Sequence, residues 1–167
     1  MPMHRKKTVL LTLTGGGFRW ESCALLRSLG PRYDYHFATN GDSRGRPPDG
    51  LPQGPLHIVE KVTSMRYKSP LRIAHNFLRA LRDSYSLIKR IKPDVIICVG
   101  SSIAVPLFVC GKLMGKTTVY IESITRVERP SRTGRILSTL RLCDRHYVQW
   151  PEAAALYPRA RYAGTVL

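Results

Sequence analysis

One acidic residue, Glu122, stands where the sequence favours acid–base chemistry. Glu122 directly follows the apolar, β-branched run from Thr117 to Ile121, and Ser123 comes next. A carboxylate at the end of a buried strand is placed to take the proton of a substrate hydroxyl, so we predict that Glu122 is a general base. A purely structural salt bridge between Glu122 and Arg126 is the alternative that the sequence leaves open. Glu21 is expected in the first turn of a helix, where the helix dipole favours a negative charge.

Two loops of small residues each follow an apolar run and precede a predicted helix. Backbone N–H groups in such loops bind phosphate or sugar hydroxyls, but the spacing is not G-x-G-x-x-G and no Walker lysine follows. Tight packing of the glycines, and capping of the next helix by the two serines, remain open as alternatives. Together with the acidic loop, these residues form a predicted substrate-binding cleft: Gly15, Gly16, Gly17, Glu21, Gly100, Ser101, Ser102, Ser123 and Arg126.

The elements that must position these residues alternate along the chain. Apolar, β-branched runs predict strands at residues 7–14, 33–39, 56–62, 94–99, 117–122, 146–149 and 162–167. Helical spacing and Gly or Pro boundaries predict helices at 18–29, 69–91, 103–114, 131–142 and 151–157. This alternation predicts an α/β fold, a Rossmann-like doubly wound parallel sheet, and the length suits a single domain spanning residues 1–167. In such a sheet the cleft lies beyond the carboxyl ends of the strands, where the residues above are placed.

The charge of the chain is unusual. The formal net charge is +16 and the isoelectric point is about 10.3, which indicates an anionic partner, substrate or surface. Many of the basic residues lie on the predicted long helix at 69–91. An amphipathic basic helix of this kind is typical of a segment that lies on anionic lipid, and a solvated helix face is the alternative. The predicted membrane-facing residues are Arg72, Arg79, Arg82, Lys89 and Arg90.

Several motifs are missing from the sequence. The four cysteines include no C-x-x-C pair, so free thiols in a reducing compartment are expected, and we expect neither a metal nor a cofactor. No apolar run reaches the length of a membrane span. These observations predict a cytoplasmic protein, peripheral on the cytoplasmic face of a membrane. The absence of RNP-type, helix-turn-helix and zinc motifs argues against nucleic acid as the partner, although the charge keeps a basic nucleic-acid-binding protein open as an alternative.

Four stretches resemble one protein family: residues 91–100 (IKPDVIICVG), 105–123 (VPLFVCGKLMGKTTVYIES), 126–137 (RVERPSRTGRIL) and 144–167 (DRHYVQWPEAAALYPRARYAGTVL). They resemble the acceptor-side, membrane-associated subunit of the two-component UDP-N-acetylglucosamine transferase of asparagine-linked glycosylation. They resemble equally the bacterial PssD-type glycosyltransferase subunits of polysaccharide biosynthesis. The amino-terminal half matches more loosely, through the glycine loop and Glu21.

The resemblance implies that the chain is the N-terminal, acceptor-binding half of a GT-B glycosyltransferase whose UDP-sugar-binding half is a separate partner subunit. The implied reaction is inverting transfer of a sugar, either N-acetylglucosamine or a sugar of the glucose, galactose or glucuronate type. The implied acceptor is a polyprenyl-diphosphate-linked saccharide. A noncatalytic scaffold that recruits the donor-binding subunit to the membrane is the first alternative.

Two features depart from the family pattern. Family members often carry a histidine after the glycine loop, and the matching position here is Phe18, so no histidine base is carried over. The eukaryotic subunits begin with a membrane-spanning helix, and no such segment is evident in this sequence. Both departures favour a peripheral protein of the bacterial type.

Overall fold

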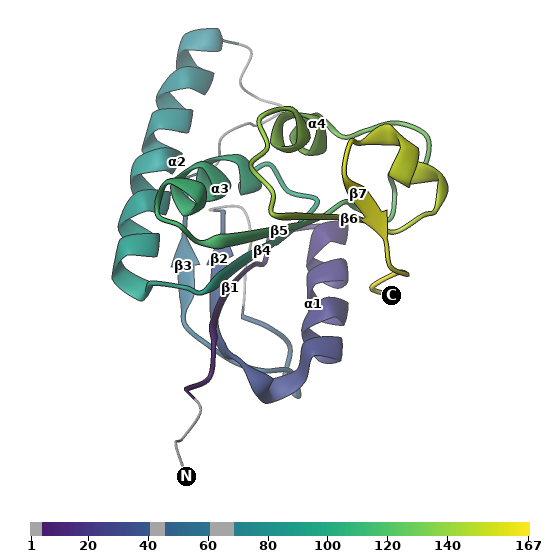
Figure 1. Cartoon of the computed structure of the whole chain (residues 1–167). Coiled ribbons are helices and arrows are strands. Elements are labelled where there is room, and N and C mark those ends of the chain that lie inside the picture. Colours follow the sequence, from purple (N-terminus) through teal and green to yellow (C-terminus); the bar gives the residue numbers. More distant parts are fainter. Residues whose placement is uncertain (1–4, 41–45, 61–68) are drawn as a thin grey trace.

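A single parallel sheet organises the chain (Figure 1). The computed structural model describes residues 5–40, 46–60 and 69–167. In them seven strands pair in the order β3-β2-β1-β4-β5-β6-β7. The first six follow the strand order of the Rossmann fold, so the predicted fold class is confirmed. The strands are β1 (Thr8–Thr12), β2 (Asp34–Thr39), β3 (Leu56–Ile58), β4 (Val95–Val99), β5 (Thr117–Ile121), β6 (Arg145–Val148) and β7 (Ala160–Tyr162).

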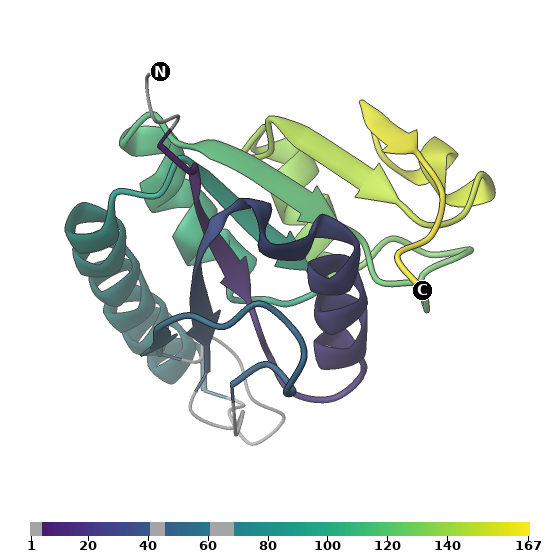
Figure 2. The same ribbon diagram turned by 90° about the horizontal axis from the view of Figure 1, so that it is seen from below.

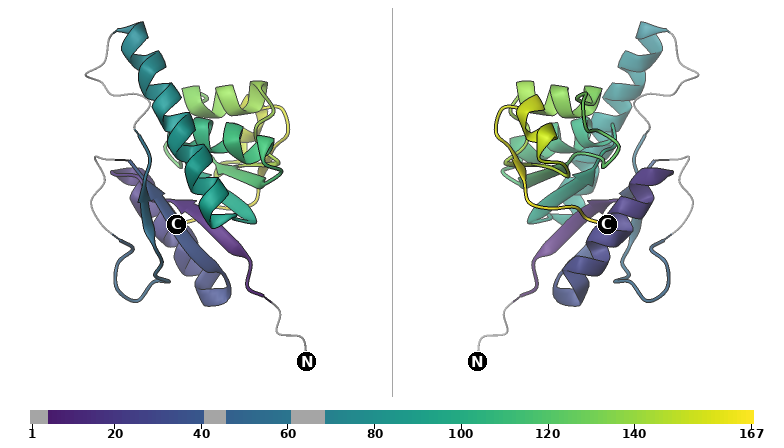
Figure 3. Two further views of the ribbon diagram at one scale, coloured as in Figure 1. Left: turned by 90° about the vertical axis from the view of Figure 1, so that its left-hand side faces the viewer. Right: turned by 90° about the vertical axis from the view of Figure 1, so that its right-hand side faces the viewer.

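The helices cover the two faces of the sheet unequally. Side views show α1 (Gly17–Leu29) on one face, with α2 (Pro70–Ile91), α3 (Ala104–Leu113) and α4 (Arg132–Thr139) together on the other (Figure 3). Viewed from the side of α1, the green strands β5 and β6 have no helix in front of them (Figure 2). Short 3₁₀ helices, η1 (Gly30–Arg32) and η2 (Glu152–Leu156), complete the fold. None of the described helices combines the length and the apolar character needed to cross a membrane.

Side chains of the central strands alternate between two hydrophobic cores. Leu10 of β1 and Ile96 of β4 belong to the core under α2 and α3, whereas Val9 and Leu11 belong to the core under α1. Because successive residues of a strand face opposite sides, a nearly continuous apolar run fills both cores at once. The layers thereby fix the carboxyl ends of the strands at one edge of the sheet.

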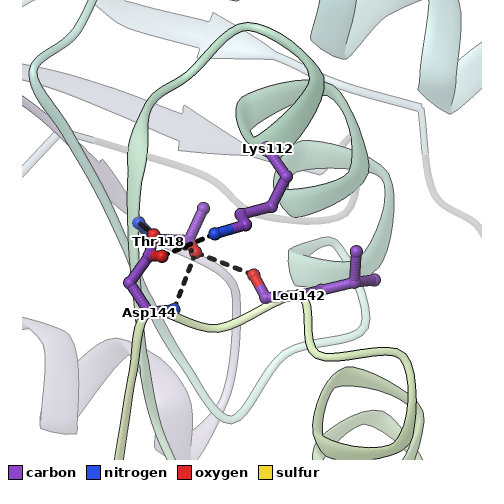
Figure 4. Close-up of polar contacts among 4 residues, drawn as sticks. All are labelled: Lys112, Thr118, Leu142 and Asp144. Atoms are coloured by element: carbon purple, nitrogen blue, oxygen red, sulfur yellow. Dashed lines mark hydrogen bonds and ion pairs between the residues drawn. The ribbon is translucent and has the colours of Figure 1, made fainter.

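Aspartates that immediately precede strands tie neighbouring strands together. The Asp94 carboxylate accepts the N–H of Thr8 at 2.8 Å, and Asp144 accepts the N–H of Thr118 at the same distance. Asp144 also bonds Lys112 of α3 at 2.5 Å, while the Thr118 hydroxyl donates to the carbonyl of Leu142 (Figure 4). These bonds satisfy backbone groups at strand starts that have no partner in the sheet ladder.

Most predicted elements are confirmed, but several boundaries were wrong. The last strand ends at Tyr162 and not at residue 167, because the chain then leaves the sheet and the N–H of Val166 donates to Gln149. The helix predicted at 131–142 ends at Thr139, and the chain turns at Arg141 with φ of 52°. The helix predicted at 151–157 is the 3₁₀ helix η2. The strand predicted at 56–62 is β3, which ends at Ile58, and residues 61–62 lie outside the described residues.

A histidine pair joins the edge strand β3 to β2 and α2. Nδ1 of His36 lies 3.0 Å from Nε2 of His57, and the Arg90 guanidinium lies 3.2 Å from Nδ1 of His57. Because a guanidinium only donates, Nδ1 of His57 accepts, and its Nε2–H therefore donates to His36. Partial burial, then His36 and Arg90, lower the pKa of His57. The structure thus requires a neutral His57.

The stability of this edge is expected to fall with acidification. Since the pKa of His57 is lower in the folded chain than the value of about 6.5 in an unfolded one, the unfolded state binds the proton first as the pH falls. The contribution of neutral His57 to the free energy of unfolding is complete above the pKa of His57 in the unfolded chain. It is lost as the pH falls through the pKa of His57 in the folded chain. Melting curves between pH 7.5 and 5 should therefore show a steeper loss for the wild type than for His57→Gln. Parallel losses in the two proteins would contradict this assignment.

Candidate functional site

The loops that follow β1, β4, β5 and β6 meet at one edge of the sheet, as predicted. The residues Gly15, Gly16 and Gly17 are exposed, as are Thr125 and Arg126. By contrast, several residues predicted to line the cleft are buried at this edge: Glu21, Ser101, Ser123 and Glu122. The structure therefore divides the predicted site into an exposed rim and a buried support.

Glu21 is the centre of one buried network. Its carboxylate accepts the Ser123 hydroxyl at 2.7 Å, the N–H of Ile124 at 3.0 Å and the Gln149 amide at 2.5 Å. The same amide group of Gln149 donates to the carbonyl of Glu122 at 3.0 Å. Glu21 thus holds the loop after β5 and the end of β6 against α1, across more than a hundred residues of sequence.

Glu122 is the centre of a second buried network. Its carboxylate accepts the Ser131 hydroxyl at 2.7 Å, the Tyr120 hydroxyl at 3.3 Å and, at a shorter distance, the Tyr157 hydroxyl. The N–H of Ser123 adds a bond at 3.1 Å. Burial, and then the bond to Glu122, raise the pKa of Tyr157. The network joins β5 to the start of α4 and to η2.

Two of the hydroxyl groups that bond Glu122 also accept a backbone N–H group. The Tyr157 hydroxyl already accepts the N–H of Ser131 at 2.8 Å, and the Ser131 hydroxyl accepts the N–H of Gly134 at 2.8 Å. Because a carboxylate only accepts, both hydroxyls donate their protons to Glu122. A carboxylate that accepts from three hydroxyls and a backbone N–H has its hydrogen-bonding capacity well satisfied, which is a structural arrangement.

The structure bears on three predictions about the acidic residues. Glu122 is only 1% exposed and its carboxylate is enclosed by donors, an environment that does not favour the predicted general base. Among the described residues, its partners are hydroxyl and backbone groups, so the alternative salt bridge with Arg126 is wrong. Glu21 is the fifth residue of α1 and not part of its first turn, because the helix begins at Gly17.

The glycine and serine loops also differ from expectation in detail. Neither Ser101 nor Ser102 caps α3 through its side chain; instead their carbonyls accept the N–H groups of Ala104 and Val105. Gly100 has φ of 62°, and a Cβ there would lie 2.5 Å from the ring of Phe18. The aromatic ring at the position of the family histidine therefore packs on the backbone of the second loop.

The sequence analysis missed three members of the networks: Gln149, Ser131 and Tyr157. Gln149 is only 2% exposed, although a glutamine after a short strand usually reaches solvent. In the sequence these residues stood out only as parts of the stretches that resemble the family. Gln149 lies in VQW, Ser131 in ERPS, and Tyr157 follows AAAL. No local pattern indicates that side chains so far apart in sequence share a carboxylate.

The exposed rim has the chemistry of a binding site. Its groups are the backbone N–H groups of the glycine loop, the Thr125 hydroxyl and the Arg126 guanidinium. These groups donate hydrogen bonds to sugar hydroxyls or to phosphate oxygens. They accept protons poorly, so the rim suits orientation of an oxygen-rich ligand better than proton abstraction from it.

The predicted membrane-facing residues of α2 are all exposed: Arg72, Arg79, Arg82, Lys89 and Arg90. The same side of the helix carries Leu71, Leu78 and Tyr85, which are 82%, 65% and 49% exposed. These three residues are spaced by seven, so they form one row along the helix. The structure thus places these three apolar side chains on the exposed surface of α2.

Comparison with known proteins identifies relatives of the chain. Residues 57–166 match the family described as oligosaccharide biosynthesis protein Alg14 like. The human UDP-N-acetylglucosamine transferase subunit ALG14 is 40% identical, over 67% of this chain and 53% of the relative. The chain thus spans about half the length of the first mammalian relatives that it matches.

Two further relatives are bacterial. The UDP-N-acetylglucosamine–N-acetylmuramyl-(pentapeptide) pyrophosphoryl-undecaprenol N-acetylglucosamine transferase of Desulforudis audaxviator is 29% identical, over 87% of this chain and 39% of that protein. The crystal structure of MurG from Acinetobacter baumannii has a TM-score of 0.69 at 16% identity, and the match covers 95% of this chain and 45% of that one. The latter similarity shows the shared fold of one half of the larger protein.

Proposed function

The chain belongs to the family of Alg14-like oligosaccharide biosynthesis proteins, and on this premise we propose that it is the acceptor-side subunit of a two-component UDP-N-acetylglucosamine transferase. The observation that carries the proposal is the family match over residues 57–166, which includes β4, β5, β6 and the loops at their carboxyl ends. The ligand site of a doubly wound sheet lies beyond these ends.

The proposed acceptor is a polyprenyl-diphosphate-linked saccharide, and the proposed donor is UDP-N-acetylglucosamine held by a partner subunit. The name of the Desulforudis relative, which transfers N-acetylglucosamine to a pyrophosphoryl-undecaprenol carrier, supports this acceptor class. In our proposal the glycine loop and Arg126 orient the acceptor for inverting transfer, in the N-terminal half of a GT-B assembly. The acceptor-binding domain comprises residues 1–167.

Proton transfer is proposed to depend on the partner. Glu21 and Glu122, two carboxylates at this edge, are enclosed by donors, so we propose that neither serves as the base. This observation also favours the second candidate function, a noncatalytic subunit that binds the acceptor and recruits the donor-binding subunit. In both candidate functions this chain positions the acceptor, and the base that removes the proton of the acceptor hydroxyl belongs to another protein.

The proposed location is the cytoplasmic face of a membrane, with α2 on the surface. The exposed row of Leu71, Leu78 and Tyr85 is flanked by arginines on the same helix. Apolar side chains that enter the headgroup boundary beside basic side chains that meet anionic phosphates are typical of interfacial helices. A polyprenyl-linked acceptor would then reach the cleft along the membrane surface.

The proposed contact with the donor-binding subunit uses the sheet face beside α1. A hollow of about 420 Å³ there is lined mainly by apolar side chains, among them Leu25, Val95, Val119 and Tyr147. Strands of a parallel sheet are normally covered on both faces, and here β5 and β6 have no helix in front of them on this side (Figure 2). The uncovered apolar strands offer a partner a surface that association would remove from water.

Equilibrium binding measurements test whether this chain binds the acceptor and leaves the donor to its partner. The purified chain in nanodiscs should bind a polyprenyl-diphosphate-linked saccharide, and Arg126→Ala should weaken that binding by about tenfold or more, as expected for a lost charged hydrogen bond. The purified chain should not bind UDP-N-acetylglucosamine measurably. Tight binding of UDP-N-acetylglucosamine by this chain alone would overturn the proposed role.

A further inference from the structure

A polar hollow of about 500 Å³ lies at the amino-terminal ends of β6 and β7, the opposite end of these strands from the cleft. Its lining includes three arginines, Arg145, Arg159 and Arg161, together with Tyr147 and Asp144. Arg159 and Arg161 belong to neither of the surfaces described above, whereas Arg145 also lines the hollow beside α1 that we propose as the contact with the donor-binding subunit.

The sheet register places these side chains side by side. β6 and β7 are parallel, with Tyr147 opposite Arg161, so both side chains leave the same face of the sheet. Arg145 lies two residues before Tyr147 on that face, and Arg159 directly precedes β7. Neighbouring strands are about 4.8 Å apart and alternate residues about 6.6 Å apart. The guanidinium groups therefore start from positions close enough to contact one small ligand.

The hollow carries positive charge without a carboxylate to balance it. The ion pairs among the described residues include none of the three arginines. Asp144, the acidic residue of the lining, already bonds Lys112 and the N–H of Thr118. Although partial burial opposes it, these bonds lower the pKa of Asp144. Like charges on adjacent strands destabilise a sheet, so an anion between the arginines would relieve a repulsion that the chain itself leaves in place.

Arg159 has a backbone conformation that arginine seldom adopts. Its φ is 70°, in the left-handed region that favours glycine. Such strain persists where the surroundings or a function hold the residue in place. A glycine at this position would relieve the strain and would remove the guanidinium from the hollow.

We propose that Arg145, Arg159 and Arg161 form a binding site for a phosphate monoester or diphosphate group, separate from the acceptor cleft. Guanidinium groups bind phosphate oxygens through paired N–H donors, and several of them around one hollow match the two or more negative charges of such a group. The group belongs either to a soluble phosphate compound or to a lipid headgroup. The proposal does not rest on the proposed transferase activity, and through Arg145 the site borders the proposed contact with the donor-binding subunit.

Calorimetric titration of the full chain with inorganic pyrophosphate at low ionic strength tests the site. Arg159→Gly removes one guanidinium and the strain together, so the fold should persist. Arg141→Gly is the matched control, since Arg141 is also an exposed arginine with positive φ, at 52°, and does not line the hollow. Arg159→Gly and Arg161→Gln should each weaken pyrophosphate binding by about tenfold or more, and Arg141→Gly should leave it unchanged.

Flotation with phosphatidylcholine vesicles that contain phosphatidic acid distinguishes a lipid headgroup from a soluble phosphate compound as the ligand. Loss of pyrophosphate affinity in Arg159→Gly with unchanged flotation assigns the site to a soluble phosphate compound. Loss of flotation in Arg159→Gly, but not in Arg141→Gly, assigns it to a headgroup. Equal pyrophosphate affinity and flotation in Arg159→Gly and the wild type, or equal losses in Arg159→Gly and Arg141→Gly, would overturn the proposal.

Discussion

Replacing Glu122 with alanine is expected to destabilise the folded chain by several kcal/mol, with about 1–3 kcal/mol for each buried hydroxyl left without its acceptor. The change removes the carboxylate that accepts the protons of the Tyr157 and Ser131 hydroxyls. For a chain of this size the melting temperature should fall by about 10 °C or more. Thermal melting followed by circular dichroism measures the effect.

Further variants test whether the loss of stability comes from the hydrogen-bond network around Glu122 or would follow any mutation in this region. Glu122→Gln keeps one acceptor oxygen, so its loss of stability should be smaller than that of Glu122→Ala. Gly134→Ala should destabilise the chain, because the new Cβ would lie 2.7 Å from the Tyr157 hydroxyl, whereas Gly17→Ala meets no atom within 4 Å. In an ordinary helix interior, glycine to alanine stabilises by about 0.5–1 kcal/mol. A wild-type melting temperature for both Glu122→Ala and Gly134→Ala would contradict the described network.

Reversing the charge of Arg79 and Arg82 to glutamate is expected to release the chain from anionic vesicles. Each basic residue near such a surface contributes about 1 kcal/mol, so two reversals remove attraction, add repulsion and cost about 4 kcal/mol in total. The partition coefficient should fall roughly a thousandfold at low salt, and less at high salt, where screening weakens the attraction. Vesicle sedimentation over a range of lipid concentrations measures it.

The matched control reverses Arg27 and Arg32, two exposed arginines on the α1 side of the sheet. This double variant has the same net charge as the first but leaves α2 unchanged. It should retain most of the binding. If the two double variants lose binding equally, net charge and not α2 determines attachment, and the proposed orientation on the membrane is wrong. Leu78→Gln should weaken binding even at high salt, because its contribution is apolar.

The sheet was predictable from sequence because each strand carries its own signal. The runs that became β1, β4 and β5 are continuous and apolar, and Gly or Pro marks the ends of their helices. Such local patterns decide element type and order, and strand order then follows from the short right-handed connections of alternating folds. The position of the site at the carboxyl ends followed from the same reasoning.

The roles of the acidic residues were not predictable, because burial depends on partners far away in the chain. Glu122 has the sequence context of a catalytic carboxylate, a polar residue after an apolar strand. Tyr157 and Ser131 enclose it, and Gln149 does the same for Glu21 from the end of another strand. Likewise, the apolar residues of α2 did not indicate which of its faces packs on the sheet. Leu71 and Leu78 remain exposed, because the buried residues Asn76, Ala80 and Leu87 lie on the opposite face of the helix.

Reconstitution with a donor-binding subunit tests the central claim most directly. Transfer of N-acetylglucosamine from UDP-N-acetylglucosamine to a polyprenyl-diphosphate-linked saccharide should be measured with this chain alone, with the donor-binding subunit alone, and with both in the same vesicles. We expect product only when both are present, with inverted configuration at the anomeric carbon. We also expect the rate per folded complex to fall by about tenfold or more with Arg126→Ala, which removes a charged hydrogen bond to the acceptor. Full turnover by either protein alone, or a combined rate that is indifferent to this chain, would contradict its assignment as the acceptor-side subunit.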